Sequence, residues 1–499
     1  MKAGEIIAAA ATVPCHPWPR RVLTADEWRA LAVALGEEPA VELLALWADP
    51  TQVFALLHDA AAGFFPVSVG VADGRYAALS PHVPAAAWFE RMVRDLWGHV
   101  AVGGTDGRPW LDHGRWGQAA PLAARPAPLA VTPAASEFLE VLAEDFHQIP
   151  LGPVFGGIGE PGHFRFSAIG ETVLRLEVRL GYAHKGTLGL MQGKSPRTAA
   201  RFAARISGDA TVAHAIAFAR AAEAAAGTEA PPRAQALRAV MAELERIANH
   251  FSDIAAMAEA AGFFRPAAPA MRLREAMLNA ADGAFGHRLM MDCTIPGGVA
   301  ADLDAGGVDA IRGAVAGLDR DLAGLVRLID GSSSLADRLA IGAVAPVLVA
   351  RCAAGGPVGR AAGRAFDARK TPGYAPYDAL SFEVPTLHSG DAEARLRIRL
   401  AEIRESTGLL LSLLENLPEG AVSVSLPLAS GEGIGWAEGC RGDVWHWLRL
   451  EGGMISAAFA RDPAWLHVPL LEAAMAGAVV ADFPVCAASV GSSVSGMDL

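Results

Sequence analysis

Polar residues at helical spacing inside otherwise apolar segments are the first candidates for chemistry in this sequence. Glu243, Arg246 and His250 stand at i, i+3 and i+7, which places a carboxylate, a guanidinium and an imidazole on one side of a helix. Groups held this close beside a core titrate as a unit and could bind or release a proton. A structural ion pair or a solvated face has the same spacing, so all three interpretations stay open.

A second set of candidates precedes that helix. Ser207, Ala210 and His214 repeat the i, i+3, i+7 spacing, and the pattern predicts that they share one side of a helix with Arg205. A histidine on an apolar face is also typical of a hydrogen-bonded core residue. A core role for His214 therefore stays open beside a functional one.

Further ionisable residues flank a predicted hairpin. Glu160 and His163 come just before its first strand, and His184 follows its second strand within the sequence GYAHKG. Turn and capping residues would have a similar composition, so spacing alone does not separate a site from a structural role.

A hairpin and long helices must position these residues. Apolar and polar residues alternate over residues 164–180, which predicts two short strands around a turn at Gly170 and Glu171. Apolar residues three or four apart predict helices over Ala86–Trp97, from Pro232 onward, and over residues 391–415. Long helices after a hairpin predict an α+β fold whose large domain is mainly a helical bundle with small sheets.

A segment rich in proline and alanine divides the chain. Residues 121–133 read PLAARPAPLAVTP, a composition typical of an extended connection between domains. We therefore predict a small α+β domain over residues 1–125, a linker over 126–140 and a large domain over 141–499.

Composition excludes several classes of protein. Acidic residues outnumber basic ones by 54 to 42 among the 499 residues, the wrong sign for a protein that gathers nucleic-acid phosphates. Apolar runs are shorter than the roughly 18–20 residues that cross a bilayer. The five cysteines lie far apart without a C-x-x-C pair, so we expect buried small side chains rather than a metal finger. The sequence contains no Walker lysine after its glycine-rich loop, no G-x-S-x-G and no HExxH.

The order and spacing of several motifs resemble those of one family, which comprises the large subunit of nickel–iron hydrogenases and the hydrogenase-like subunit of complex I. Within this family the sequence is most similar to the formate hydrogenlyase type. The motifs are GPVFGGIGEPGHFRFSAIGE (152–171), GYAHKG (181–186), RISGDATVAH (205–214), PPRAQALRAVMAELERIANH (231–250) and EGCRG (438–442). Ahead of them, DLWGHV and DGRPWLDHGRW resemble the small complex I subunit that docks beside the large one. The resemblance covers most of the chain and implies a hydrogenase-type large domain.

The resemblance also implies that a metal site has been lost. In active hydrogenases four cysteines hold nickel and iron, and the corresponding positions here are Ser207, Ala210, Ser493 and Gly496. A cyanide-bearing nickel–iron centre requires thiolates, which hydroxyl, methyl and hydrogen cannot replace. We therefore predict no metal on this chain and no hydrogen activation, with an active nickel–iron hydrogenase kept as an alternative.

Complex I, which lacks the same cysteines, binds the quinone headgroup in the vacated pocket. The resemblance places Phe155, Gly159 and Gly208 where complex I presents hydrogen-bond donors, and none of these side chains can donate. We predict no cofactor on this chain, keep a quinone as a possible ligand of the pocket, and expect iron–sulfur clusters on a partner subunit.

The ionisable frame of the family is retained. Glu160 falls at the position of the proton-gating glutamate of hydrogenases, and the remaining candidates are His163, His184, Arg205, Asp209, His214, Glu243, Arg246 and His250. We predict that these residues form a buried cluster that relays protons or lines the pocket and couples protonation to a change of shape.

The resemblance implies a hetero-oligomer. Its expected partners are a small iron–sulfur subunit and membrane-arm subunits that translocate ions, with no nucleic acid, and the chain would lie on the cytoplasmic face of the cell membrane. The predicted function is a non-nickel subunit of a complex I-related or formate hydrogenlyase-like oxidoreductase that couples electron transfer or quinone events to ion translocation. The alternatives are an inert interaction scaffold and a catalytic subunit of a hydrogenase or NADH–quinone oxidoreductase.

Overall fold

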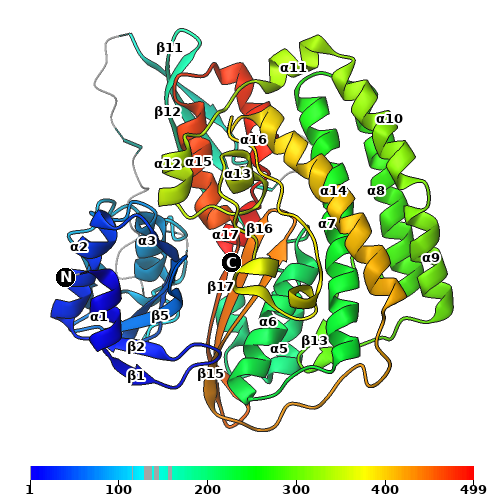
Figure 1. The fold of residues 1–499 in the computed structure, drawn as a ribbon. Helices are drawn as coiled ribbons and strands as arrows, with labels where there is room; N and C mark the ends of the chain where they lie inside the picture. Colours follow the sequence, from blue (N-terminus) through cyan, green and yellow to red (C-terminus); the bar gives the residue numbers. More distant parts are fainter. Residues whose placement is uncertain (1, 115, 129–137, 140–144, 156–159) are drawn as a thin grey trace.

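The computed structural model of the protein describes residues 2–114, 116–128, 138–139, 145–155 and 160–499. The fold is mixed α+β, with 45% of residues in helices and 20% in strands, so the predicted class is confirmed. The N-terminal part lies on one side, the long helices lie on the other, and the C-terminal end lies between them beside β16 and β17 (Figure 1).

A five-stranded sheet forms the core of the N-terminal part. Its strand order is β1-β2-β5-β4-β3, with β2 and β5 parallel and the other neighbours antiparallel. Its elements are α1 (Ala3–Ala9), β1 (Ala11–Val13), β2 (Arg20–Leu23), α2 (Ala25–Glu37), β3 (Val41–Ala48), β4 (Gln52–Asp59) and β5 (Gly63–Gly70). After the sheet come β6 (Arg75–Ala77), α3 (Ala86–Trp97), β7 (Val100–Val102), β8 (Gln118–Ala119) and β9 (Ala127–Pro128). The helix predicted over Ala86–Trp97 is confirmed.

The predicted hairpin is confirmed. Strands β11 (His163–Ile169) and β12 (Thr172–Arg179) pair antiparallel around Gly170 and Glu171. A third strand, β10 (His147–Leu151), pairs with β11 and was not predicted, because its short sequence contains Pro150 and shows no clear alternation.

Helix α7 is the axis of the helical part. It spans Pro232–Ala260 and packs against α8, α14 and α16, and the helices predicted from Pro232 and over residues 391–415 are both confirmed. The helices of this region are α4 (Thr187–Met191), α5 (Pro196–Ala203), α6 (Thr211–Ala226), α8 (Phe264–Phe285), α9 (Ala305–Val315), α10 (Leu318–Asp330), α11 (Ser333–Leu339), α12 (Pro346–Arg351), α13 (Gly356–Ala361), α14 (Ala392–Glu415), α15 (Ala464–Met475), α16 (Phe483–Val490) and α17 (Val494–Asp498). A short hairpin joins β13 (Thr294–Ile295) to β14 (Gly298–Val299).

A further three-stranded sheet, which was not predicted from the sequence and is called the second sheet below, lies between α6 and the N-terminal part. Strands β15 (Gly431–Gly439), β16 (Gly442–Glu451) and β17 (Met454–Arg461) form an antiparallel meander. Helix α6 approaches β15 so closely that a Cβ on Gly435 would lie 2.1 Å from the Ala217 carbonyl oxygen. Glycine is therefore required at this position of the sheet.

Aromatic contacts join the N-terminal sheet to this meander. The rings of Trp47 and Phe459 stack with centroids 5.1 Å apart, and those of Trp18 and Trp436 lie 4.9 Å apart. Most of the predicted linker lies outside the described residues, so the domain boundaries at 125 and 141 stay predictions.

None of the helices in the described part of the chain combines the length and the hydropathy that a membrane-crossing segment needs. All five cysteines are buried and free, in agreement with the expectation of small buried side chains.

Candidate functional site

The C-terminal segment returns to the loop that precedes α6. Ser207 lies in that loop and Ser493 caps the N-terminus of α17, and their hydroxyl oxygens lie 2.9 Å apart. Both side chains are buried. The two sequence motifs that the family resemblance pairs with metal ligands therefore meet in space, although 286 residues separate them.

The helical spacing predicted for Ser207, Ala210 and His214 is wrong. Helix α5 ends at Ala203 and α6 begins at Thr211, so Ser207 and Ala210 lie in the connecting turn, where Ala210 has φ −132° and ψ 33°. The Ala210 amide donates to the Ser207 carbonyl at 3.3 Å. Glycine and aspartate at positions 208 and 209 favour such a turn over a continuous helix.

The donor set at this turn does not fit a nickel–iron centre. Ser207 and Ser493 offer neutral hydroxyls, Ala210 offers a methyl group, and Gly496 offers no side chain. A Cβ on Gly496 would lie 2.5 Å from Cγ of Asp462, so the carboxylate of Asp462 fills the space that a side chain at this position would need.

A chain of ion pairs extends from the turn into the protein. Asp209 accepts a hydrogen bond from Ser207 and pairs with Arg441 at 2.5 Å. Arg441 also pairs with Asp253 at 3.3 Å, and Asp253 pairs with Arg399 at 2.9 Å. Burial alone would raise the pKa of Asp253, but Arg441 and Arg399 hold it below its usual range. The two carboxylates and two guanidiniums balance in charge.

Glu160 and His184 contact the C-terminal segment. Oε2 of Glu160 accepts the Val494 amide at 2.5 Å, and Nδ1 of His184 lies 2.6 Å from the Asp498 carbonyl oxygen. The carboxylate of Asp498 accepts the amides of Gly181 and Ala183, each at 2.7 Å. Burial raises the pKa of Asp498 to about 6 and lowers that of His184. These contacts hold the GYAHKG loop, Glu160 and α17 together.

Two histidines and an aspartate join α6, which follows the turn, to β16 and to the residue after β17. Nε2 of His214 lies 3.0 Å from Oδ2 of Asp462, and Nδ1 lies 3.0 Å from Nε2 of His446. All three side chains are buried, and burial with the neighbouring His214 holds the pKa of His446 well below its usual range. His214 therefore joins α6 to the second sheet and fixes Asp462 beside Gly496.

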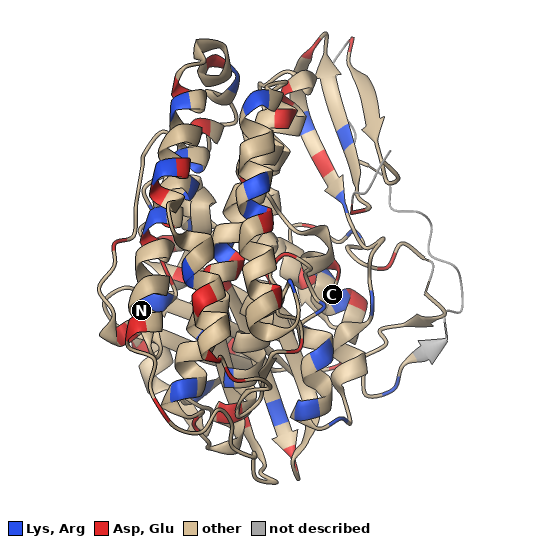
Figure 2. Ribbon diagram, turned by 90° about the vertical axis from the view of Figure 1, so that its right-hand side faces the viewer, with Lys and Arg blue, Asp and Glu red and all other residues tan. Residues whose placement is uncertain are grey.

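The predicted stripe on α7 is a buried ionic seam and not a solvated face. Glu243, Arg246 and His250 are each at most 1% exposed. Glu243 accepts from Arg369 at 3.0 Å, from Arg246 at 3.3 Å and from the Tyr377 hydroxyl at 2.6 Å. Figure 2 shows charged residues recurring along the long helices, not only at their ends.

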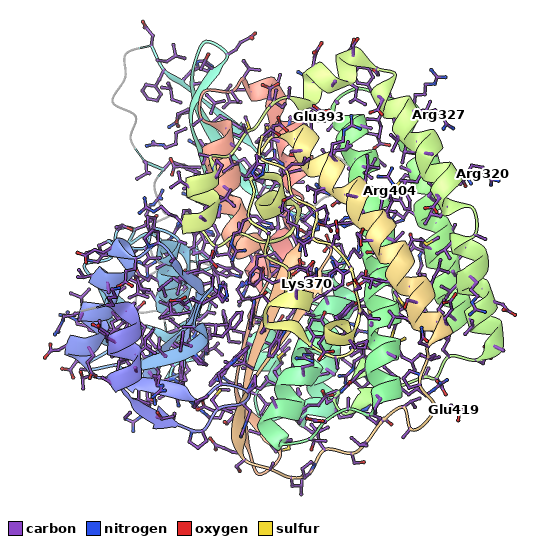
Figure 3. All side chains as sticks on the ribbon, in the orientation of Figure 1. Arg320, Arg327, Lys370, Glu393, Arg404 and Glu419 are labelled. Carbon is purple, nitrogen blue, oxygen red and sulfur yellow. The ribbon has the colours of Figure 1, made fainter. Side chains whose placement is uncertain are left out.

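The far side of the seam is built from α13, α14 and β15. Nε2 of His250 lies 2.8 Å from Oε2 of Glu402, and Arg360 pairs with Glu402, Glu438 and Asp367. Arg404, two residues along α14 from Glu402, is instead exposed on the outer surface (Figure 3). The inward residues of α14 thus face the stripe on α7, and the outward ones meet solvent.

The candidates divide into two groups, and Arg205 and His163 lie outside both. Ser207, Asp209, Ser493, Gly496, Glu160, His184 and His214 surround the turn or the C-terminal segment, whereas Glu243, Arg246 and His250 form the seam. Arg205 does not join either group, because it points outward to Asp292, 2.7 Å away, and its side chain is 45% exposed. His163 lies at the start of β11, where burial and Arg165 lower its pKa.

The partners of these residues were not predicted from the sequence. Arg441 and Glu438 belong to the EGCRG motif, which was noticed only for its resemblance, and Asp253 continues the α7 stripe at i+10. Of the three positions compared with quinone donors, Gly159 lies outside the described residues. An added Cβ on Gly208 would meet no atom within 4 Å, and the Phe155 ring lies 6.2 Å from that of Phe164.

Comparison with known proteins relates the chain to two families. The profile of the respiratory-chain NADH dehydrogenase 49 Kd subunit matches residues 261–428, and that of nickel-dependent hydrogenases matches residues 185–255. The chain is 30% identical to the carbon monoxide-induced hydrogenase of Rhodospirillum rubrum, over 70% of this chain and 98% of that protein. It is 29% identical to formate hydrogenlyase subunit 5 of Escherichia coli, over 85% of this chain and 77% of that protein.

A solved structure shares the fold. A chain of the membrane-bound sulfane sulfur reductase, an archaeal respiratory membrane complex, superposes with a TM-score of 0.68 at 24% identity. The match covers 72% of this chain and all of the other.

Proposed function

Because this chain belongs to the family that unites nickel-dependent hydrogenases with the 49 kDa subunit of respiratory-chain NADH dehydrogenase, we propose that it is a non-nickel subunit of a membrane-associated oxidoreductase in this family. In this proposal it couples electron transfer or quinone events to ion translocation by partner subunits. The observation that carries the proposal is the turn at Ser207, where hydroxyls and ion pairs stand in place of thiolates.

The proposed partners are a small iron–sulfur subunit and ion-translocating membrane subunits. One relative is named as a subunit of formate hydrogenlyase and another as subunit alpha of a membrane-bound hydrogenase, and the superposed structure comes from a complex titled as membrane-bound. In this proposal the chain reaches the cytoplasmic face of the membrane through its partners, and a quinone is a possible ligand beside the turn. The likeness of the N-terminal part to the small complex I subunit remains a prediction.

The seam supplies a place to hold one proton. Its carboxylates are those of Glu243, Asp367, Glu402 and Glu438, and its guanidiniums are those of Arg246, Arg360 and Arg369. Four carboxylates against three guanidiniums leave one negative charge in excess, which a buried site disfavours. Burial and Asp367 raise the pKa of Glu438, whereas burial lowers that of His250, so in this proposal the proton is held by Glu438.

The seam is connected to the turn along α7. Asp253 and His250 stand one turn apart on this helix, and Asp253 is bonded to the same Arg441 that holds Asp209. A change of charge beside Ser207 can therefore act on Asp253 and, through His250 and Glu402, on the proton held by Glu438. This arrangement gives redox or quinone events at the turn a route to the interior.

Substitutions in the purified native complex test the proposal. Glu438→Gln keeps the size of the side chain and mimics its protonated form, and Glu160→Gln removes the charge beside α17. We expect both variants to assemble normally and to lose ion translocation coupled to turnover. Glu419→Gln, at an exposed position (Figure 3), is the matched control and should retain full coupling.

The alternative of an inert scaffold makes the opposite prediction. Full coupled activity in both Glu438→Gln and Glu160→Gln complexes would remove the proton-relay role and favour the scaffold. Size-exclusion chromatography of each variant complex separates lost coupling from lost assembly. Tyr377→Phe, which removes one hydrogen bond to Glu243 and no charge, controls for mild disturbance of the seam.

A further inference from the structure

Arg220 has no ionic partner in the part of the chain that the structure describes, unlike the arginines of the seam. Its guanidinium lies between two aromatic rings, 4.7 Å from the centroid of Tyr374 and 4.4 Å from that of Trp436. Its Nε is enclosed and has no hydrogen-bond partner among the described residues. Stacking fixes the plane of the guanidinium but does not neutralise its charge.

This arginine lines a cavity of about 800 Å³ between α6, β15 and the start of the chain. Other residues of the wall are His16, Trp18, Thr228, Tyr374 and Trp436. The volume falls within the range of sites for small organic molecules, which combine apolar walls with a few placed polar groups.

None of the acidic neighbours, which include the exposed Asp378, forms an ion pair with Arg220 among the described residues, so its guanidinium can bind a ligand. Glu223 also lines the cavity, but its carboxylate is bound by Arg238 and by the Gly297 amide at 2.8 Å. Glu229 is exposed at the edge of the cavity. Burial lowers the pKa of Arg220 to about 10, so the side chain is still charged at neutral pH. A partly buried charge without a counter-ion is costly, and an anion in the cavity would remove that cost.

We infer that this cavity binds a small organic acid with a flat apolar body, whose carboxylate meets the terminal nitrogens of Arg220. The rings of Tyr374 and Trp436 cover the guanidinium, and Nε is enclosed, so the edge formed by the two terminal nitrogens is left for a ligand. A planar carboxylate matches that edge with two parallel hydrogen bonds. The apolar body would lie against Trp18 and Ile434.

Calorimetric titration of the full-length protein with benzoate tests this site. We expect saturable binding, and at least about tenfold weaker binding of benzamide, which has the same shape but no charge. Arg220→Gln should weaken benzoate binding by a similar factor. Arg220→Lys, which keeps the charge but not the fork, should weaken it less. Arg320→Gln removes an arginine whose side chain is 82% exposed on α10, and this control variant should bind benzoate with the same affinity as the unmodified protein.

Four results would overturn the inference, and the first three concern benzoate. These are equal affinity for benzoate and benzamide, unchanged benzoate affinity in Arg220→Gln, and no benzoate binding up to about 10 mM. Binding of inorganic phosphate in preference to benzoate would also contradict a carboxylate site. Ala224→Leu adds bulk at the cavity wall without a change of charge, so loss of benzoate binding in this variant supports the site even if Arg220→Gln fails to fold.

Discussion

Ser207 and Ser493 place their hydroxyl oxygens 2.9 Å apart in the interior of the protein. The first belongs to the turn before α6 and the second caps the last helix, α17. The resemblance to nickel–iron hydrogenases pairs these two segments with the cysteine-bearing segments of those enzymes, and here a polar contact joins them. The fold thus brings the two motifs together through side chains that carry hydroxyls.

This contact predicts a specific cross-link. In the double variant Ser207→Cys/Ser493→Cys, the two sulfur atoms should oxidise to a disulfide, because the replaced oxygens already lie in contact. Mass spectrometry of the peptides should show residues 207 and 493 linked. The control pair Ser207→Cys/Ser489→Cys should not link, since the Ser489 hydroxyl is directed to Arg395. Equal linking of both pairs would contradict the described position of the C-terminal segment.

Substitution of Gly496 by any residue with a side chain should destabilise the protein. A Cβ there would collide with Asp462, which His214 and the Ala464 amide hold in place. Gly496→Ala should therefore lower the free energy of unfolding by about 1–3 kcal/mol. In the control variant Gly208→Ala, in the turn next to Ser207, the added Cβ meets no atom within 4 Å, so this variant should be close to neutral. Similar thermal unfolding of both variants would show that Asp462 does not fill this space.

The two aspartates paired with Arg441 should contribute differently to the free energy of unfolding. Asp253 is 5% exposed and is bound by both Arg441 and Arg399, so Asp253→Asn leaves the fully buried guanidinium of Arg399 without its counter-ion and should cost about 3–5 kcal/mol. The Asp209 side chain is 27% exposed, and Asp209→Asn should cost about 0–1 kcal/mol. Thermal unfolding ranks the variants, and a larger loss for Asp209→Asn than for Asp253→Asn would be incompatible with this order of ion pairs.

Glu245 should make stability depend on pH. It is buried against the start of α6 and accepts the amides of Val212 and Ala213 at 2.7 and 3.1 Å. Burial raises its pKa from 4.5 to about 8. The folded state therefore prefers the neutral carboxyl, and the stability from this preference is complete below pH 4.5 and is lost as pH rises to about 8.

The variant Glu245→Gln isolates that dependence. Over this range the unmodified protein should lose stability relative to the variant by at most about 1.4 kcal/mol per pH unit. Thermal unfolding of both proteins between these limits measures the difference. Parallel curves would mean that the two amides keep Glu245 ionised in the folded state.

Periodicity was enough to predict the elements with a strong pattern. Helix α7 begins at a proline and keeps one apolar stripe over its length, and the hairpin at Gly170 alternates clearly. The second sheet was missed because β15 to β17 are almost entirely buried, so polar residues do not alternate with apolar ones as they do on a half-exposed sheet.

The sequence predicted which kinds of residue make up the candidate site, but it did not predict which residues pair with one another. The i, i+3, i+7 spacing brought out Glu243, Arg246 and His250, but it could not show that Arg360 and Glu402, from distant helices, complete their seam. The same spacing misled at Ser207 and Ala210, since a turn can imitate a helical interval over four residues. Arg205 was misplaced because a sequence pattern does not reveal that its partner is Asp292.

The nickel content of the purified native assembly tests the central claim most directly. Inductively coupled plasma mass spectrometry, scaled to the amount of this chain, should find less than about a tenth of a nickel atom per chain, because none of Ser207, Ser493, Ala210 and Gly496 offers a thiolate. About one nickel atom per chain, retained when the chain is separated from its partners, would contradict the loss of the metal site.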